Sequence, residues 1–251
     1  MGAGLSADDR LSLAADKIDA ILAAGGNGLT FTVVERSTLY AKPGGPRIEI
    51  PDPNDRYKTL GFADAYYLGA AIAEGSATPD GFWLQMRRGP MTAGAAPDFA
   101  NAPMTLSSLV RNGVTWRNDG DGWYATANPP GIGLDSATLA LLPTLLRDAG
   151  GPTLTETSVV DGETRTTFEA TGTVGKAPGL MAIDAASFTE LVGPLEFTVD
   201  TKGRLIGIHA LTRNLRMTTY DLLVDVVIEI RYDTSPGLPD PDPTLAPATK
   251  A

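Results

Sequence analysis

His209 is the only histidine in this chain, so it is the first residue to consider for chemistry. It lies in the stretch LEFTVDTKGRLIGIHAL, from Leu195 to Leu211, in a chain without cysteine. A serine hydrolase needs a serine within hydrogen-bonding reach of such an imidazole. The sequence has no G-x-S-x-G motif to present one. We therefore expect His209 to be an ordinary strand side chain, and we predict that the chain is not an enzyme and has no catalytic residues.

Metal binding would have to rely on oxygen ligands, which suit Ca²⁺ or Mg²⁺. The two best clusters are NDGDG at residues 118–122 and DPND at residues 52–55. Neither belongs to a twelve-residue loop that ends in a bidentate glutamate. Asn, Asp and Gly also gather wherever a hairpin turns. We interpret both clusters as turns and predict no metal and no cofactor; a calcium- or sugar-binding module at residues 118–122 is an alternative.

Other classes of site find little support. Gly131 and Gly133 are followed by Ser136 where a phosphate-binding G-x-G-x-x-G motif needs its third glycine. The chain has 30 acidic and 20 basic residues, and this balance opposes nucleic-acid binding. The many acidic residues on predicted strand exteriors are typical of solvated surface rather than of a glycosidase. No segment approaches the roughly 20 apolar residues that a membrane span requires.

Apolar and aromatic residues on predicted strands remain as the main candidates for function. Such residues either pack a core or line a concave pocket for an apolar ligand. The choice of lining residues depends on strand register, because a shift of one residue exchanges the two faces of a strand. The candidate ligand-binding residues are Phe31, Val33, Trp83, Trp116, Trp123, Phe168, Leu195, Phe197 and Val199.

The elements that must position these residues begin with a helix. Ser6 can cap it, and its apolar stripe runs from Leu11 to Leu22 at helical spacing. β-Branched and aromatic residues then predict strands over residues 29–40 and 47–50. Residues 51–80 look like an insertion, in which the alanine-rich stretch 62–74 predicts a helix.

The middle of the chain predicts a strand over residues 81–88 and a low-information Gly/Ala/Pro-rich loop over residues 89–102. Residues 114–126 predict a hairpin that turns at the NDGDG cluster. A helix is expected over residues 138–147, capped by Asp135 or Ser136, with Pro143 kinking or restarting it.

The second half is mostly strands. Residues 153–160 and 164–174 flank Asp161-Gly162, the hairpin dipeptide. A short helix is expected from Asp184 to Val192, and a further hairpin then turns at residues 200–203 and leads into the strand of His209. The last strand alternates clearly, with Val224, Val226, Ile228, Ile230 and Tyr232 on one face.

Tight turns between consecutive strands favour antiparallel pairing and an α+β fold. We expect a strongly bent antiparallel sheet with helices packed on its concave face, in a single domain over residues 1–235. The proline- and aspartate-rich tail, residues 236–251, is expected to be extended and mobile.

The order of these motifs resembles the outer-membrane lipoprotein carrier (LolA-like) superfamily, and within it the branch of the lipid-binding lipoproteins LppX and LprG. The resemblance covers nearly the whole chain except residues 51–80 and 89–110. The segments that carry it are LTFTVVER (29–36), GVTWR (113–117), GWYA (122–125), LALLPTLL (139–146), VVDGETRTTFEATG (159–172), VDTKGRL (199–205) and IEIRYD (228–233).

The resemblance implies an α+β fold with an open, highly curved antiparallel β half-barrel, whose helices pack on its concave face and enclose a hydrophobic cavity for acyl chains. The implied function is lipid binding or lipid transport without catalysis. It also implies a location in the cell envelope or periplasm, with a lipid ligand and with a membrane-anchored donor or acceptor protein as a further partner. The lipoproteins of the family begin with a signal peptide and an acylated cysteine, and neither occurs here. The expected location therefore applies if a leader has been removed ahead of Met1.

Two hypotheses from different classes follow. The first is a non-enzymatic carrier or binding protein for a lipid or another long apolar ligand. The second is a protein-interaction or envelope-sensing domain on the same fold, with a shrunken cavity and an exposed apolar patch.

Overall fold

The computed structural model describes residues 5–23, 28–52, 54–88, 104–111, 114–126, 136–171, 189–214, 217–232, 237–239 and 241. Its first half contains α1 (Ala7–Leu22), β1 (Leu29–Ala41), β2 (Ile48–Asp52), β3 (Asp55–Ala63), β4 (Ala65–Thr78), β5 (Gly81–Arg88), β6 (Met104–Arg111), β7 (Val114–Asn118) and β8 (Trp123–Thr126). Its second half contains α2 (Ser136–Arg147), β9 (Gly150–Val160), β10 (Glu163–Thr171), β11 (Thr189–Leu191), β12 (Leu195–Asp200), β13 (Leu205–Asn214) and β14 (Tyr220–Tyr232).

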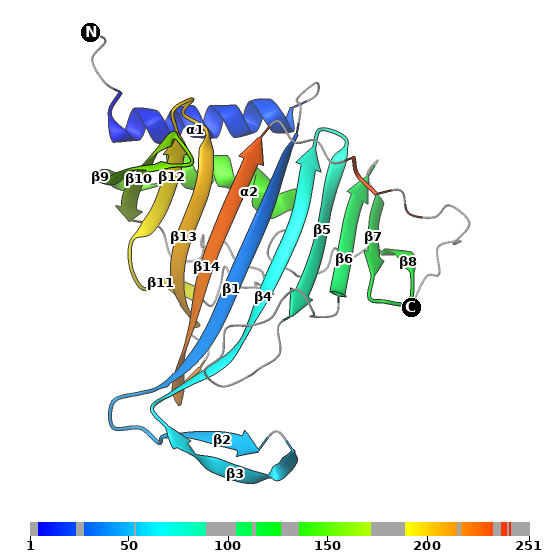
Figure 1. Cartoon of the computed structure of the whole chain (residues 1–251), viewed down its shortest axis with the longest axis vertical. Coiled ribbons are helices and arrows are strands. Elements are labelled where there is room, and N and C mark those ends of the chain that lie inside the picture. Colours follow the sequence, from blue (N-terminus) through cyan, green and yellow to red (C-terminus); the bar gives the residue numbers. More distant parts are fainter. Residues whose placement is uncertain are drawn as a thin grey trace.

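The described strands form a twelve-stranded antiparallel sheet and a separate two-stranded hairpin. The large sheet has the order β8-β7-β6-β5-β4-β1-β14-β13-β12-β10-β9, with β11 paired to β13. It does not close, since β8 and β9 lie at opposite edges, and it curves around the two helices (Figure 1). This confirms the predicted open half-barrel with helices on its concave side.

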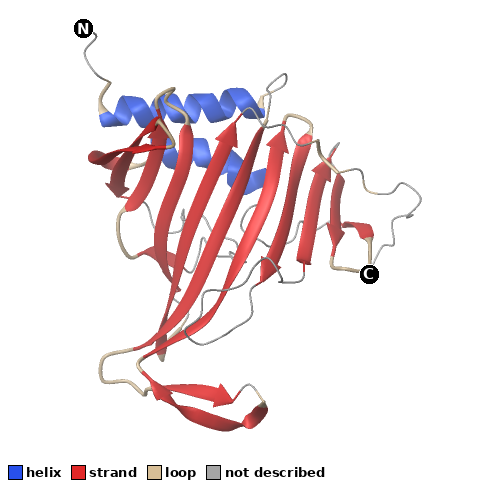
Figure 2. Ribbon diagram, in the orientation of Figure 1, coloured by secondary structure: helices blue, strands red, loops and turns tan. Residues whose placement is uncertain are grey.

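Helix α1 forms where the sequence predicts it. The Ser6 hydroxyl accepts a hydrogen bond from the backbone N–H of Asp9, and the Asp9 carboxylate accepts one from the backbone N–H of Ser6, which completes a capping box. Leu11, Ala14 and Ile18 are buried on the face that meets the sheet. This stripe docks α1 across one end of the strands (Figure 2).

The centre of the sheet is β1, which pairs along its whole length with β14 on one side and β4 on the other. Alternate residues of β1 are buried, as expected for a strand with one face on a core. The alternation of β14 follows the predicted pattern, with Val226, Ile228 and Ile230 buried. The Asp161-Gly162 and Asp200–Gly203 turns also lie where they are predicted, and Asp161, Gly162 and Gly203 all have positive φ angles.

The prediction of a helix over residues 62–74 is wrong. Residues 55–63 form β3, and residues 65–78 form β4, a long strand paired on both sides. Alanine favours helix by intrinsic propensity, but the hydrogen bonds to β1 and β5 override that preference. The small side chains serve the strand, because Ala71, Ala73 and Ala77 are buried against the core.

Three further expectations need correction. The helix predicted up to Val192 ends instead in a short strand, β11, while residues 184–188 lie outside the described residues. Strand β6 follows the predicted Gly/Ala/Pro-rich loop without having been anticipated. In the tail, Leu238 is half-buried and approaches Gly81 of β5, so at least this residue packs on the domain.

No helix among the described residues is both long enough and apolar enough to span a membrane.

Candidate functional site: the concave face of the sheet

The concave face is a continuous row of apolar side chains that strand register brings together. Phe168 lies opposite Phe197, Phe197 opposite Ile208, Ile208 opposite Ile228, and Ile228 opposite Val33. Because opposed residues of neighbouring strands point to the same face, one apolar surface runs across β10, β12, β13, β14 and β1. It continues over β4, β5 and β6 through Ala73, Met86 and Leu106.

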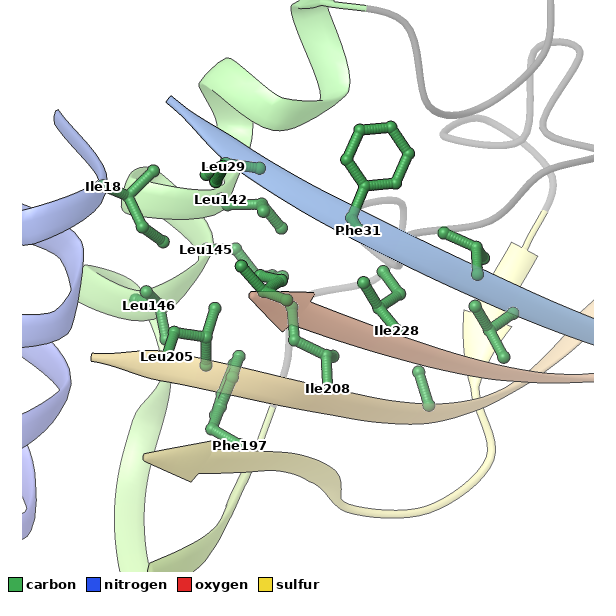
Figure 3. Close-up of a cluster of buried hydrophobic side chains, with 14 of the residues drawn as sticks. Ile18, Leu29, Phe31, Leu142, Leu145, Leu146, Phe197, Leu205, Ile208 and Ile228 are labelled. Atoms are coloured by element: carbon green, nitrogen blue, oxygen red, sulfur yellow. The ribbon is translucent and has the colours of Figure 1, made fainter. Parts of the chain in front are cut away.

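Helix α2 closes one end of this face. Leu142, Leu145 and Leu146 are buried and meet Ile208 and Leu205 of the sheet (Figure 3). The sequence predicts that Pro143 kinks or restarts this helix; Pro143 lies inside α2, which continues past it, so there is no restart.

A charged link joins the two helices. One guanidinium nitrogen (Nη2) of Arg147 in α2 lies 2.7 Å from Asp16 and 2.6 Å from Asp19 of α1. The two helices therefore form one layer at the upper end of the sheet. Apolar packing and this ion-pair cluster hold them together.

Six of the nine residues proposed from the sequence lie on this face. They are buried and share one apolar cluster with the helices; the six are Phe31, Val33, Phe168, Leu195, Phe197 and Val199. The Phe31 ring stacks on the ring of Phe82, with centroids 5.6 Å apart and an interplanar angle of 11°. The sequence reading identified Phe31 but missed Phe82.

The three tryptophans lie on the opposite, convex face. Phe82, Leu84 and Met86 are the buried residues of β5, so Trp83 between them points outward. Trp116 is placed by pairing, because it and Trp83 both lie opposite Leu109 of β6.

The pairing of β8 with β7 places Trp123 on this convex face as well. It lies opposite Asn118, two residues along β7 from Trp116. The tryptophans were predicted to line the ligand site, and we do not retain them in it. The F-x-L-x-M alternation of residues 82–86 is the sequence signal that marks the inward face of this strand.

The concave face changes character away from the helices. Glu35 lies on the same face of β1 as Val33, opposite Val226 and Ala71, and is buried. Ser37 and Thr212, which both lie opposite Val224, are also buried. The face is thus apolar beneath the helices and polar toward the far end of β1 and β13, which is the distribution that an amphipathic ligand would match.

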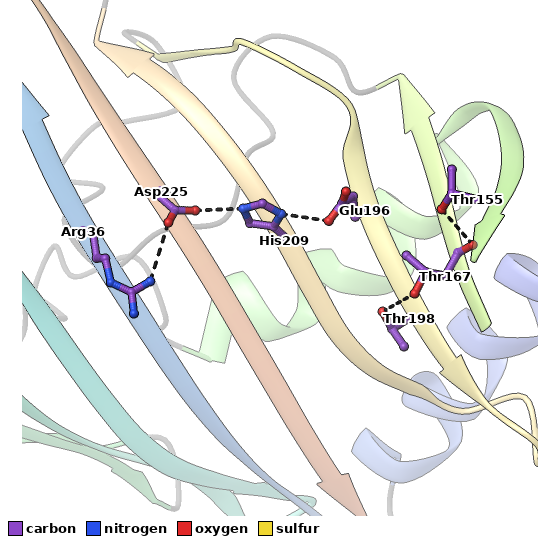
Figure 4. Close-up of polar contacts among 7 residues, drawn as sticks. All are labelled: Arg36, Thr155, Thr167, Glu196, Thr198, His209 and Asp225. Carbon is purple, nitrogen blue, oxygen red and sulfur yellow. Dashed lines mark hydrogen bonds and ion pairs between the residues drawn. The ribbon is translucent and has the colours of Figure 1, made fainter. Parts of the chain in front are cut away.

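His209 lies on the convex face, in a chain of charges that crosses four strands (Figure 4). Its ring nitrogens lie 2.8 Å from carboxylate oxygens of Glu196 and Asp225, and Asp225 is 3.6 Å from Arg36. Partial burial lowers the pKa of His209, but the hydrogen bonds and charges of the two carboxylates outweigh it and raise that pKa above its usual value. The arrangement stabilises a surface imidazolium and provides no nucleophile.

The two turn clusters use their oxygens internally. Asn118 accepts hydrogen bonds from the backbone N–H groups of Gly120 and Gly122, and Asp119 binds Arg117 and Tyr124. Asp52 likewise accepts a hydrogen bond from the backbone N–H of Asn54 in the other cluster. Within the described part of the chain, no three acidic or histidine side chains are grouped as metal ligands.

A hollow of about 440 Å³ lies where β10, β12, β13 and β14 end near α1. Its walls are mostly charged, and it differs from the apolar cavity that the sequence predicts. Arg204 is fixed there between Asp200, at 2.7 Å, and the ring of Tyr232, at 4.8 Å. Burial raises the pKa of the Tyr232 hydroxyl well above its usual value, although the charge of Arg204 opposes this.

Comparison with known proteins was made at the level of sequence and of structure. No protein-family model and no curated protein matches the sequence. Among solved structures, the chain is similar to LprF from Mycobacterium bovis, with 13% identity, a TM-score of 0.48, and coverage of 94% of this chain and 96% of that one. It is also similar to the Mycobacterium tuberculosis lipoprotein LppX, with 12% identity, a TM-score of 0.41, and coverage of 93% and 98%.

A third similarity is to a LolA superfamily protein from Nitrosomonas europaea, with 11% identity, a TM-score of 0.28, and coverage of 93% and 96%. All three cover nearly the whole of both chains at low identity.

Proposed function

We propose that this protein is a non-enzymatic binding or carrier protein for a lipid or another long apolar ligand. The observation behind this proposal is the concave face itself, which is continuously apolar from β10 to β6 and becomes polar at Glu35, Ser37 and Thr212. An acyl chain along the apolar rows would gain about 0.8 kcal/mol for each buried CH₂ group. The polar end would receive the headgroup.

The ligand site would consist of the inward residues of the central strands. Val33 and Ile228 would contact the middle of an acyl chain, and Phe31 with Phe82 would contact the part nearest the helices. Binding then requires α2 to shift from the sheet, because its leucines occupy the apolar face at that end. We further propose that the protein works outside the cytoplasmic membrane and exchanges its ligand with a membrane or a membrane-anchored protein.

A matched pair of substitutions on β1 tests the site. Val33 and Val34 are neighbours on opposite faces of the strand, Val33 buried in the concave face and Val34 half-exposed on the convex face. Val33→Thr keeps the volume but adds a hydroxyl to the apolar row, so it should weaken binding of a fluorescent fatty acid by about tenfold. Val34→Thr should leave binding unchanged.

Native mass spectrometry and organic extraction of the purified protein supply an independent check. We expect a co-purifying lipid that is present with the Val34→Thr variant and reduced with Val33→Thr. Equal binding by the two variants at equal melting temperature, or a purified protein that neither carries nor takes up an acyl ligand, would rule out the concave face as a lipid site.

The alternative, a protein-interaction or envelope-sensing domain, is favoured by one observation. A hairpin beyond the end of the sheet exposes Tyr57, Leu60 and Phe62. If no acyl ligand binds and this hairpin captures a defined protein, the alternative is the correct reading.

A further inference from the structure

A hairpin arm extends from the far end of the sheet. It comprises residues 42–64, that is, the connection after β1, the strands β2 and β3, and the link to β4. In Figure 1 it lies beyond the lower ends of β1 and β4, turned across the strand direction, at the opposite end of the molecule from both helices. Its two strands pair only with each other within the described sheets.

The arm exposes large apolar side chains. Tyr57 is 82% exposed, Leu60 66% and Phe62 59%, all within six residues of β3. Isolated exposed apolar residues are common on soluble proteins, but a group of them on one projecting element marks a contact surface. The pairing of β2 with β3 is interrupted on both sides of Pro51.

The arm is also electrically neutral, unlike the rest of the chain. It holds four basic and four acidic residues, whereas the whole chain has 20 basic and 30 acidic, so the remainder accounts for the entire net charge of −10. Two ion pairs neutralise charges within the arm, Arg47 with Asp64 at 2.9 Å and Lys58 with Asp55 at 3.1 Å. An anionic surface therefore repels the arm less than it repels the rest of the chain taken as a whole.

We propose that this arm inserts Tyr57, Leu60 and Phe62 into the headgroup region of a lipid bilayer. A bilayer interface can accommodate a projecting arm of this kind, and aromatic residues such as Tyr57 and Phe62 favour that interface. This inference goes beyond the carrier proposal and holds whether or not the concave face binds a ligand.

Vesicle flotation of the full chain tests the inference. Wild-type protein should float with phosphatidylcholine vesicles. The triple variant Tyr57→Ser/Leu60→Ser/Phe62→Ser should bind the vesicles with an affinity lower by about tenfold or more. The control is a second triple variant, Leu154→Ser/Val159→Ser/Val160→Ser, on the β9 edge. Leu154 and Val159 are 60% and 68% exposed, so this control removes similar apolar surface elsewhere.

Lipid composition adds a second readout. Because the arm is neutral and the rest of the chain is acidic, replacing about one fifth of the lipid with phosphatidylglycerol should not strengthen binding.

Two controls accompany the flotation assay. Light scattering of the protein alone measures self-association, and the melting temperatures of both triple variants should stay close to the wild-type value.

Three outcomes would overturn the inference. The first is that the wild type does not float. The second is that the arm variant floats as well as the β9 control. The third is that the arm variant loses a protein dimer or a specific protein complex instead of vesicle binding. The fatty-acid assay on Val33→Thr and Val34→Thr remains independent, so a failure of the arm and a failure of the concave site can be told apart.

Discussion

At the scale of single residues, His209 is a convex-face side chain whose role is electrostatic. Glu196 on β12 and Asp225 on β14 face it, and Arg36 on β1 faces Asp225. The pKa of His209 is raised in the folded state, so its contribution to stability is fully present below the unfolded value of about 6.5. That contribution is lost as the pH rises through the folded pKa.

His209→Gln should therefore destabilise the protein more at pH 5 than at pH 9. The difference should stay below about 1 kcal/mol, because the ring is nearly half exposed and water screens the pairs. Urea unfolding of both proteins at the two pH values measures it. Fatty-acid binding should not change, since the imidazole lies on the face away from the proposed site, and a larger loss of stability at pH 9 would contradict the assignment.

Gly75 shows how a missing side chain shapes the concave face. A Cβ atom at this position would collide with the carbonyl oxygen of Trp83 and with the ring of Phe31. The glycine thus leaves room for the stack of Phe31 on Phe82.

Gly75→Ala should cost about 1 to 3 kcal/mol of unfolding free energy, because the strand or the ring must move. Gly193→Ala is the matched control, since no atom lies within 4 Å of a Cβ built there. Denaturant titration compares them, and equal stability of the two variants would show that Phe31 is not held as described.

At the scale of elements, α2 is held to the sheet by its leucines. Leu146 is buried and Thr144 on the same helix is exposed. Leu146→Ala removes buried volume and should cost about 2 to 4 kcal/mol, whereas Thr144→Ala should be nearly neutral. Thermal unfolding distinguishes them, and a neutral Leu146→Ala would mean that α2 does not pack tightly on the sheet.

The elements also show which local signals can be trusted. The capped helix α1, the Asp-Gly hairpin and the alternating strand β14 could be predicted because each depends on contacts between near neighbours in sequence. The alanine-rich stretch of β4 could not, since its strand conformation depends on pairing with both β1 and β5. The prediction that the three tryptophans face the concave side was wrong for a related reason. A shift of one residue in strand register exchanges the concave and convex faces, and the sequence does not fix that register.

At the scale of the whole molecule, the arm is separable from the half-barrel. Tyr40 of β1 lies opposite Ala65 of β4 at the base of the arm, so these strands can be joined directly. Replacing residues 41–64, that is, the arm together with Ala41, by Asn-Gly, a two-residue hairpin turn, should leave the core intact and shift the melting temperature by only a few degrees.

The same deletion should abolish vesicle binding while fatty-acid binding persists. Circular dichroism and the two binding assays measure these effects. A deleted protein that fails to fold would show that the arm belongs to the core, whereas one that still floats with vesicles would place the membrane contact elsewhere.

The sequence by itself determined the local elements with strong signals, the absence of a recognisable catalytic motif and the family resemblance, because these depend on residue types and on spacing along the chain. The open half-barrel was expected from the family resemblance, which depends on the order of these motifs. Only the tertiary structure decided which face each residue occupies. In it the three tryptophans lie on the convex face, whereas Phe82, Met86 and Glu35 lie on the concave face. The physical reason is that cross-strand register and the hydrogen bonds that set it are made between segments far apart in the sequence.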